Sequence, residues 1–354
     1  MARLDQICKL NMGQSPDSSS YNENKIGMPF FQGNADFGTL HPTVRIWCSA
    51  PTKVANPGDI LISVRAPIGA LNIANVECCI GRGLAALAVD ERKCKKEYLW
   101  HAISSKVDEL NSKGTGSTFK AISKNILAET EIPLPNLDMQ THIAAVLDKI
   151  DNLISFRKQQ LARLDELVKA RFVEMFGDPE LNPRGLPVLP WNAVFLTTTG
   201  KLDSNAMVEN GRYPFFTCAK ESYKIDSYAF DCEALLLAGN NAAGIYDVKH
   251  YKGKFNAYQR TYVLRLMNEK WSYILFKRQL EDKLQYLQSQ SKGTNTRYLT
   301  LGILNELRFV VPPVAEQEQF AVFVEQTDKS KVAVQKALDK AQLLFDSLMQ
   351  KYFG

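Results

Sequence analysis

The sequence contains no long hydrophobic run: no apolar stretch reaches the roughly 18 residues that a membrane-spanning helix needs. Its first residues, MARLDQICKLNMG, lack the apolar core of a signal peptide. The 7 cysteines are odd in number and scattered, and none belongs to a CxxC pair, which disfavours a disulfide framework and a zinc ribbon. These absences predict a cytoplasmic protein without a membrane span.

The common catalytic and cofactor motifs are also missing. There is no GxxxxGK[ST] loop for phosphates, no GxSxG elbow for a nucleophilic serine, and no FxGxG with the Asn-Pro-Pro-aromatic partner of an adenine methyltransferase. The GNNAAG stretch at 239–244 lacks the GxGxxG pattern and is interpreted as a turn. The 4 histidines have no carboxylate or cysteine at metal-ligand spacing. We therefore expect no metal, no cofactor and no catalytic residue, so the chain is predicted not to be an enzyme by itself.

What the sequence does contain is a tandem repeat of half its length. The segment KGTGSTFKAISKNILAETEIPLPNLDMQ at 113–140 matches KGTNTRYLTLGILNELRFVVPPVAEQ at 292–317. Gly177, at the end of the first copy, corresponds to Gly354 at the end of the second, an offset of 177 residues in a chain of 354. Units of this size are domains rather than solenoid repeats.

Each half begins with a globular block, residues 1–137 and 178–314. Both blocks are rich in short β-prone runs that are bounded by Gly, Pro, Asn and Asp. Lys and Arg outnumber Asp and Glu by 15 to 13 in the first block and by 17 to 13 in the second, so the net charge of +5 comes from these blocks. Such a mild excess indicates a nucleic-acid partner only weakly. We expect two strand-rich α/β (α+β) domains.

Each half ends with a long helical block, residues 138–177 and 315–354. Ahead of its final Gly, the first block has no Gly or Pro over 39 residues, which predicts a helix of roughly 58 Å. A heptad pattern places polar residues such as Arg157 and Lys331 on the apolar seam, so each helix needs a partner. We expect the two helices to form an antiparallel coiled coil in which Lys331 faces Leu164. The alternative is that each helix packs only on its own domain.

Polar, basic loops occur at corresponding places in both blocks. The Lys-Gly-Thr loops at 113–120 and 292–297 offer main-chain N–H groups and hydroxyls that suit phosphate oxygens. SVRAPIG, IGRG, GNNAAG and KHYKGKFNAYQR carry side chains that read base edges or stack on bases. The candidate nucleic-acid contacts are Arg65, Arg82, Lys113, Thr115, Ser117, Lys120, Asn240, Asn241, Lys252, Tyr258, Arg260, Lys292, Thr294, Asn295 and Arg297. The candidates for reading bases are Arg65, Arg82, Asn240, Asn241, Tyr258 and Arg260. Each stretch alone is also compatible with a plain surface turn.

The arrangement resembles the specificity subunits of type I restriction–modification systems, the HsdS family. The resemblance covers the whole chain and rests on two target-recognition domains, a tandem repeat and a long helix closing each half. The local matches are GTGSTFKAI, GTNTRYLTL, LVKARFVEMFGDP and the helix entries IPLPNLDMQTHIAAVLDKID and VVPPVAEQEQFAVFVEQTD. VAVQKALDKA in the second helix departs from the family pattern because it has few large apolar residues. GNNAAG stands where the first domain has SVRAPIG, so the two domains are expected to read different sequences.

The resemblance implies a non-catalytic phage-defence protein that binds double-stranded DNA. Each recognition domain would read one half of a bipartite site, and the helices would fix the distance between the halves, at most about 17 base pairs at 3.4 Å each. The helices would also dock two methylase subunits carrying S-adenosylmethionine, which restriction/translocase subunits would join. The alternatives are a recognition subunit of another phage-defence methylation system and a coiled-coil scaffold that does not bind DNA.

Overall fold

The computed structural model describes residues 1–116, 120–242 and 244–354, and the chain divides into two compact units. Unit 1 comprises Met1–Lys158 together with Lys336–Gly354, and unit 2 comprises Gln159–Gln335. Each unit therefore contains a β-rich domain and segments of two long helices.

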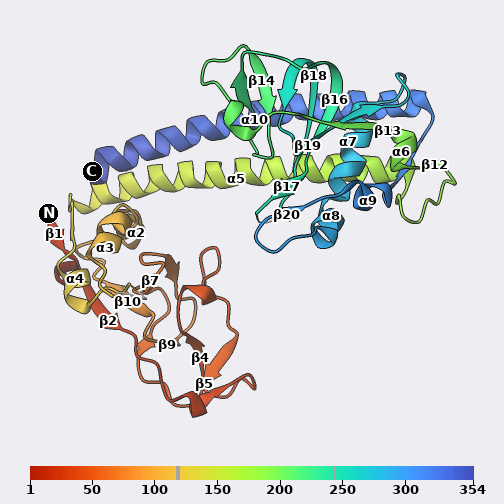
Figure 1. Cartoon of the computed structure of the whole chain (residues 1–354). Coiled ribbons are helices and arrows are strands. Elements are labelled where there is room, and N and C mark those ends of the chain that lie inside the picture. Colours follow the sequence, from red (N-terminus) through yellow and green to blue (C-terminus); the bar gives the residue numbers. More distant parts are fainter. Residues whose placement is uncertain (117–119, 243) are drawn as a thin grey trace. The chain divides into compact units, whose positions relative to one another are not determined.

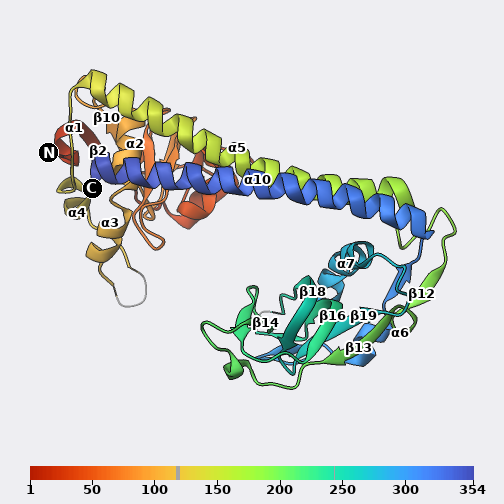
Figure 2. The same ribbon diagram turned by 90° about the horizontal axis from the view of Figure 1, so that it is seen from above.

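The two long helices are α5 (Leu137–Phe176) and α10 (Val314–Phe353), each with 40 residues. They pack antiparallel, as both views of the chain show (Figures 1 and 2). The predicted fold of two β-rich domains with paired antiparallel helices is thus confirmed, and the alternative in which each helix packs only on its own domain is wrong. Among the described residues, no helix combines the length and apolarity needed to cross a membrane.

Unit 1 is built from short strands and four short helices. Its strands are β1 (Ala2–Arg3), β2 (Cys8–Met12), β3 (Tyr21–Asn22), β4 (Met28–Phe31), β5 (Ile46–Cys48), β6 (Val54–Ala55), β7 (Ile60–Ser63), β8 (Leu71–Ile73), β9 (Cys78–Ile80), β10 (Leu84–Val89) and β11 (Glu131–Ile132). Its short helices are α1 (Leu4–Ile7), α2 (Lys96–Ser104), α3 (Val107–Lys113) and α4 (Lys124–Ala128), with 3₁₀ turns at η1 (Ser18–Ser20) and η2 (Asn34–Asp36). The sheets have the orders β2-β10-β7-β8 and β3-β5-β4-β9-β6, and β1 pairs with β11.

Unit 2 repeats this plan with longer strands. Its strands are β12 (Val188–Pro190), β13 (Phe195–Thr199), β14 (Tyr213–Phe216), β15 (Tyr223–Ile225), β16 (Phe230–Ala238), β17 (Asn240–Asn241), β18 (Val248–Ala257), β19 (Thr261–Leu266), β20 (Arg297–Tyr298) and β21 (Arg308–Val310). Its short helices are α6 (Trp191–Val194), α7 (Tyr273–Asp282), α8 (Leu284–Gln290) and α9 (Leu301–Asn305), with a 3₁₀ turn at η3 (Ser204–Ala206). One six-stranded sheet has the order β13-β19-β16-β18-β14-β15, and β12-β21 and β17-β20 form separate pairs.

The two units share a strand pattern that differs at two breaks. Each has a single parallel pair among its described strand pairings, β4 with β9 in unit 1 and β14 with β18 in unit 2. In unit 2 the long strand β16 stands in place of the two consecutive short strands β6 and β7, and the long strand β18 stands in place of β8 and β9. The break between β6 and β7 is the turn Asn56-Pro57-Gly58-Asp59, where Pro57 cannot donate a ladder hydrogen bond and Gly58 has φ +92°. No Pro or Gly interrupts β16, so its sheet is continuous.

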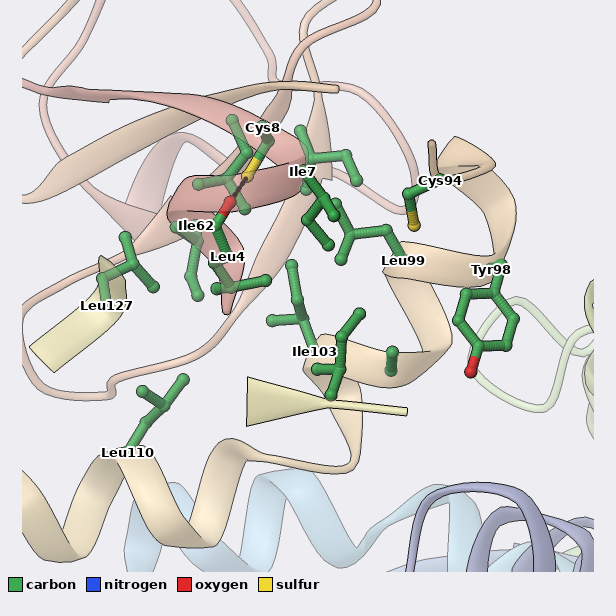
Figure 3. Packing of buried hydrophobic residues seen from close by; sticks show 14 of the residues in the cluster. Leu4, Ile7, Cys8, Ile62, Cys94, Tyr98, Leu99, Ile103, Leu110 and Leu127 are labelled. Atoms are coloured by element: carbon green, nitrogen blue, oxygen red, sulfur yellow. Dashed lines mark hydrogen bonds between the residues drawn. The ribbon is translucent and has the colours of Figure 1, made fainter. Parts of the chain in front are cut away.

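The core of unit 1 gathers apolar side chains from segments far apart in the sequence. Figure 3 shows Leu4, Ile7 and Cys8 from the start of the chain packed near Leu99 and Ile103 of α2. Burial raises the pKa of the Cys8 thiol to about 12, so this side chain acts as a small apolar residue. Leu99, Ala102 and Ile103 of α2 belong to the same buried cluster as Ile60 and Ile62 of β7.

The end of α10 completes this core. Phe353 is 4% exposed within it, and Phe345, Leu348, Met349 and Tyr352 pack against the same cluster. In unit 2 the reverse holds, because Val168, Phe172 and Phe176 from the end of α5 belong to the core there. The rings of Phe172 and Phe176 lie 5.6 and 5.7 Å from the ring of Phe320 on α10. Each domain is thus closed by a helix end from the other half of the sequence.

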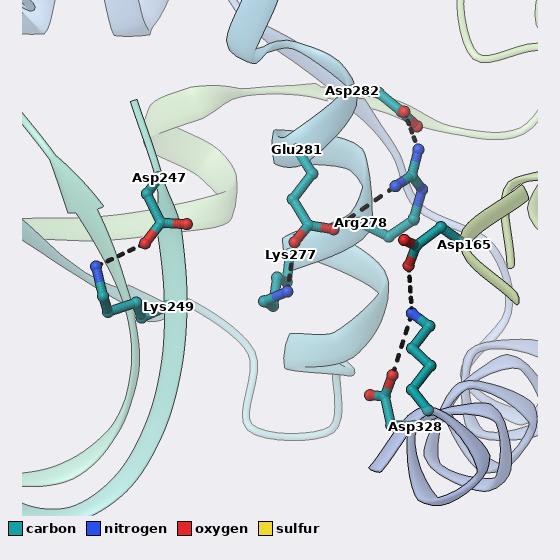
Figure 4. A network of polar contacts seen from close by, with 9 residues as sticks. Asp165, Asp247, Lys249, Lys277, Arg278, Glu281, Asp282 and Asp328 are labelled. Atoms are coloured by element: carbon teal, nitrogen blue, oxygen red, sulfur yellow. Dashed lines mark hydrogen bonds and ion pairs between the residues drawn. The ribbon is translucent and has the colours of Figure 1, made fainter. Parts of the chain in front are cut away.

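Within unit 2, Lys331 marks the register of the helix pair. Its Nζ contacts Asp165 at 2.6 Å and Asp328 at 3.4 Å (Figure 4). Partial burial acts to lower the pKa of Lys331, but the two carboxylates outweigh it and raise that pKa. The predicted partner was Leu164, and the observed contact is with the next residue, so the polar fault on this helix is answered by its partner helix.

A glutamine in the first turn of each long helix ties that helix to its domain. Gln140 is fully buried; its Nε2 donates to Pro135 O (2.7 Å) and Lys93 O (3.2 Å), and its Oε1 accepts from Lys95 N (2.8 Å). The corresponding contacts in unit 2 are made by Gln317, which is also fully buried and binds Pro312 O (2.8 Å) and Ser272 N (3.0 Å). Lys95 and Ser272 are the N-cap residues of α2 and α7, so each glutamine joins two helix starts.

Candidate nucleic-acid interface

In unit 1 the two polar loops singled out in the sequence lie together. Thr115 and Ala121 exchange two backbone hydrogen bonds of 2.9 Å each, which closes the Lys-Gly-Thr loop. Arg65 forms a bridge with the same Ala121, and Ala66 N donates to Lys120 O at 3.0 Å. The SVRAPIG stretch and the Lys-Gly-Thr loop therefore form one continuous polar edge of the domain.

Unit 2 builds the same edge from different side chains. Lys292 and Tyr298 exchange two backbone hydrogen bonds of 3.1 and 2.8 Å, in the position of Thr115 and Ala121. Asn240 pairs with Tyr298 and Asn241 pairs with Arg297 in the ladder β17–β20. The GNNAAG stretch and the second Lys-Gly-Thr loop are thus joined as their counterparts are in unit 1, but with Asn in place of Arg.

A glycine sets the shape of the loop in unit 2. Gly293 has φ +100°, and a Cβ atom there would lie 2.2 Å from Thr296 O, so no other residue fits without rearrangement. The tight turn leaves Thr294, Asn295 and Arg297 exposed. The Arg297 guanidinium donates a hydrogen bond to Gln288 O at 3.2 Å, so the side chain is held at the end of α8.

Beside the polar edge of unit 1 is a concave site that we call the arginine hollow. It has a volume of about 360 Å³ and is lined by Phe30, Gln32, Gly33, Asn34, Ala35, Asp36, Arg45, Ile46, Arg65, Ala66, Arg82 and Gly83. Two predicted contacts, Arg65 and Arg82, meet here. Four of the lining residues were not identified from the sequence, namely Gln32, Asn34, Asp36 and Arg45. The segment FFQGNADF has the composition of a strand end followed by a turn. The available signal was the pair of amide side chains, Gln32 and Asn34, on either side of Gly33.

Tyr258 and Arg260 line two further hollows, in unit 2. Tyr258 borders one of about 440 Å³, which we call the tyrosine hollow, together with Ser204, Asn205, Met207, Thr217, Cys218, Ala219 and Tyr223. Arg260 borders a smaller one of about 220 Å³ with Thr199, Gly239, Gln259, Tyr262 and Leu299. The hydrogen bond from Gly239 N to Arg260 O (2.9 Å) joins this segment to the Asn240 loop.

Two predicted contacts, Lys113 and Lys252, stand apart from these clusters. Lys113 lies at the end of α3, and its Nζ is 2.6 Å from Glu109, whose pKa it lowers. Lys252 lies within β18 and pairs at 3.0 Å with Glu233, which also binds His250 at 2.9 Å. Ser117 falls outside the described residues.

The family comparison decides the identity of this fold. The model of the type I restriction modification DNA specificity domain matches residues 1–166 and 194–343, most of the chain. The chain belongs to this family. Its members are specificity subunits, the non-catalytic subunits of type I systems. The paired polar loops of both units therefore lie in specificity domains.

Similar proteins agree with this assignment. The chain is 42% identical over 165 residues to the type I restriction enzyme MjaX specificity subunit of Methanocaldococcus jannaschii, which covers 47% of this chain and 39% of that protein. It is 39% identical over 141 residues to the type I restriction enzyme EcoDI specificity subunit of Escherichia coli, covering 38% and 30%. These matches span well under half the length of either relative.

A solved structure shows the same fold over the full length. The S subunit of a type I restriction–modification system from M. genitalium superposes with a TM-score of 0.68, covering 100% of this chain and 95% of that one. Its sequence is 16% identical, so the likeness concerns the fold alone.

Proposed function

We propose that this chain is the DNA-reading subunit of a type I restriction–modification complex, in which each unit reads one half of a bipartite site. The observation that carries this proposal is the repeated polar edge, built on one backbone pattern with Arg65 in one unit and Asn240 in the other. Arginine and asparagine prefer different bases in the major groove, guanine and adenine respectively. Two like frames with unlike readers suit two unlike half-sites.

The residues divide into two roles. The proposed phosphate contacts are Thr115, Lys120, Lys292, Thr294, Asn295 and Arg297. The proposed base contacts are Arg65, Arg82, Asn240, Asn241, Tyr258 and Arg260. Lys113 and Lys252 already hold carboxylate partners, so we assign them a weaker, long-range electrostatic role. Ser117 remains a predicted contact by its place in the loop.

The long helices are proposed to set the spacing between the half-sites and to dock two methylase subunits. Exposed apolar side chains support docking, since Phe156, Val322, Val332 and Leu343 are each more than half exposed along α5 and α10. S-adenosylmethionine would bind the methylase subunits, restriction/translocase subunits would complete the complex, and the DNA ligand implies a cytoplasmic location.

The test is to express the chain with and without a type I methylase subunit and to sequence the methylated adenines of the host. We expect a bipartite, non-palindromic methylation site when both proteins are present and no methylation with the chain alone. Methylation by the purified chain with S-adenosylmethionine would overturn the proposal, and so would a methylase whose site does not change when this chain is removed. A chain that binds protein partners but not DNA would favour the scaffold alternative.

A further inference from the structure

The arginine hollow carries two cations that the protein itself leaves uncompensated. Asp36 is 8% exposed and accepts hydrogen bonds from Gln32 N (2.8 Å), Gly33 N (3.4 Å) and Arg45 Nε (3.1 Å), so the one carboxylate and the Arg45 guanidinium cancel as a neutral pair. Within the part of the chain that the structure describes, the guanidinium groups of Arg65 and Arg82 make no hydrogen bond or ion pair. They are free to bind a ligand.

The backbone holds these two arginines next to each other. Val64 N donates to Gly83 O at 2.9 Å. This hydrogen bond places Arg65, the residue after Val64, opposite Arg82, the residue before Gly83. Gly83 N in turn donates to Gln32 O at 3.2 Å, and a Cβ atom at Gly83 would lie 2.5 Å from that oxygen. Only glycine permits this close approach, which holds Arg82 beside Arg65 in the lining of the hollow.

We propose that the arginine hollow receives the major-groove edge of a guanine in the half-site read by unit 1, with Arg65 and Arg82 donating to its O6 and N7 atoms. This inference rests on the proposed function and names the base that the site takes. Guanine presents two acceptors on this edge, O6 and N7, and each of the two guanidinium groups offers planar N–H donors to them. The uncharged amides of Gln32 and Asn34, which also line the hollow, suit the neighbouring base pair.

The tyrosine hollow of unit 2 lies at the corresponding place but has different chemistry. In unit 1 the hollow borders the ends of the parallel pair β4–β9 and includes Ile46, which pairs with Phe30. In unit 2 it borders β14–β18 and includes Tyr223, which pairs with Phe215. Among the described residues lining the tyrosine hollow, none is charged. Guanine reading by an arginine pair is therefore a property of the first half-site.

The experiment uses the full chain with a type I methylase subunit and compares methylation sites of the unaltered chain with those of the Arg65→Lys/Arg82→Lys double variant. Lysine keeps the charge but loses the planar fork, so a phosphate contact would survive, whereas discrimination of guanine would weaken. We expect the unaltered site to hold a fixed guanine in one half. In the double variant, discrimination at that position should fall by roughly 5- to 140-fold while the other half-site stays unchanged.

A second measurement probes the base directly. Replacing that guanine by 7-deazaguanine, which lacks the N7 acceptor, should weaken binding by the unaltered complex and have no further effect on an Arg65→Ala/Arg82→Ala variant. The unchanged second half-site serves as the folding control, because a misfolded chain would lose both halves. Two outcomes overturn this inference and leave the proposed function standing. One is that the lysine variant methylates the same bipartite site as the unaltered chain. The other is that the half-site affected by the variant contains no fixed guanine. The absence of any bipartite site overturns the proposed function itself.

Discussion

Replacing Gln140 with alanine should destabilise unit 1 far more than an ordinary glutamine substitution would. The side chain of Gln140 is fully buried, and its removal leaves three backbone groups without their partner. These groups are Lys95 N, Lys93 O and Pro135 O. An unsatisfied buried polar group costs about 1–3 kcal/mol. Because water can enter the space and repair part of the loss, we expect about 3–5 kcal/mol for Gln140→Ala. For Gln317→Ala, which strands two groups, we expect about 2–4 kcal/mol.

The assay is hydrogen exchange of the full chain in increasing urea, which reports each unit separately. Gln140→Ala should lower the opening free energy of amides in unit 1 and spare unit 2, and Gln317→Ala should do the reverse. The exposed Gln159 on α5 gives the matched control, for which a change within about 0.5 kcal/mol is expected. A loss below about 1 kcal/mol for Gln140→Ala, or an equal loss in both units, would refute the anchoring role.

Three other predictions concern the polar loops, the thiols and the helix pair. Each of the variants Lys120→Ala and Lys292→Ala should reduce the slope of log affinity for DNA against log salt concentration by about 1. The slope is measured on the assembled complex by titration from low to high salt. Unchanged slopes would mean that these loops do not contact the phosphates. Iodoacetamide at pH 8 should label Cys218 in the folded chain but spare the five buried thiols, which the reagent cannot reach; burial also raises the pKa of one of them, Cys94, to about 12. Mass spectrometry that finds Cys94 labelled before urea is added would contradict the packing. A fragment of residues 1–177 should associate with itself more weakly than with the remaining half and, with a methylase, recognise a palindrome; equal self-association in sedimentation would mean that the helix register is wrong.

Sequence periodicity predicted the large elements well because they depend on local signals. The absence of Gly and Pro indicated the long helices, and polar residues such as Lys331 on the seam indicated that each needs a partner. Which domain each helix end closes was beyond reach, since Phe176 and Phe353 occupy equivalent positions in the repeat and periodicity does not distinguish near from far partners. The match of Gln140 with Gln317 was visible, but its three-way anchoring depends on tertiary contacts.

The candidate site was predicted in parts that only folding joins. The Arg65 loop and the Lys-Gly-Thr loop were recognised separately, and their pairing through Ala121 is a long-range contact that no local pattern encodes. Lys113 was grouped with its loop because of its neighbours in sequence, yet it ends a helix and pairs with Glu109. Asp36 and Arg45 were overlooked because a neutral pair inside a turn carries no signature of its own.

The exchange of helix ends between the two halves has a consequence for synthesis of the protein. The core of unit 1 is incomplete until Phe353 and its neighbours have been made, although its strands are finished some 200 residues earlier. At about 5–20 residues per second, the nascent first domain would wait roughly 10–40 s for its last apolar layer. During that interval the exposed patch around Tyr98 is a natural target for chaperones. A late frameshift would then remove the last apolar layer of the first domain to be translated rather than that of the last.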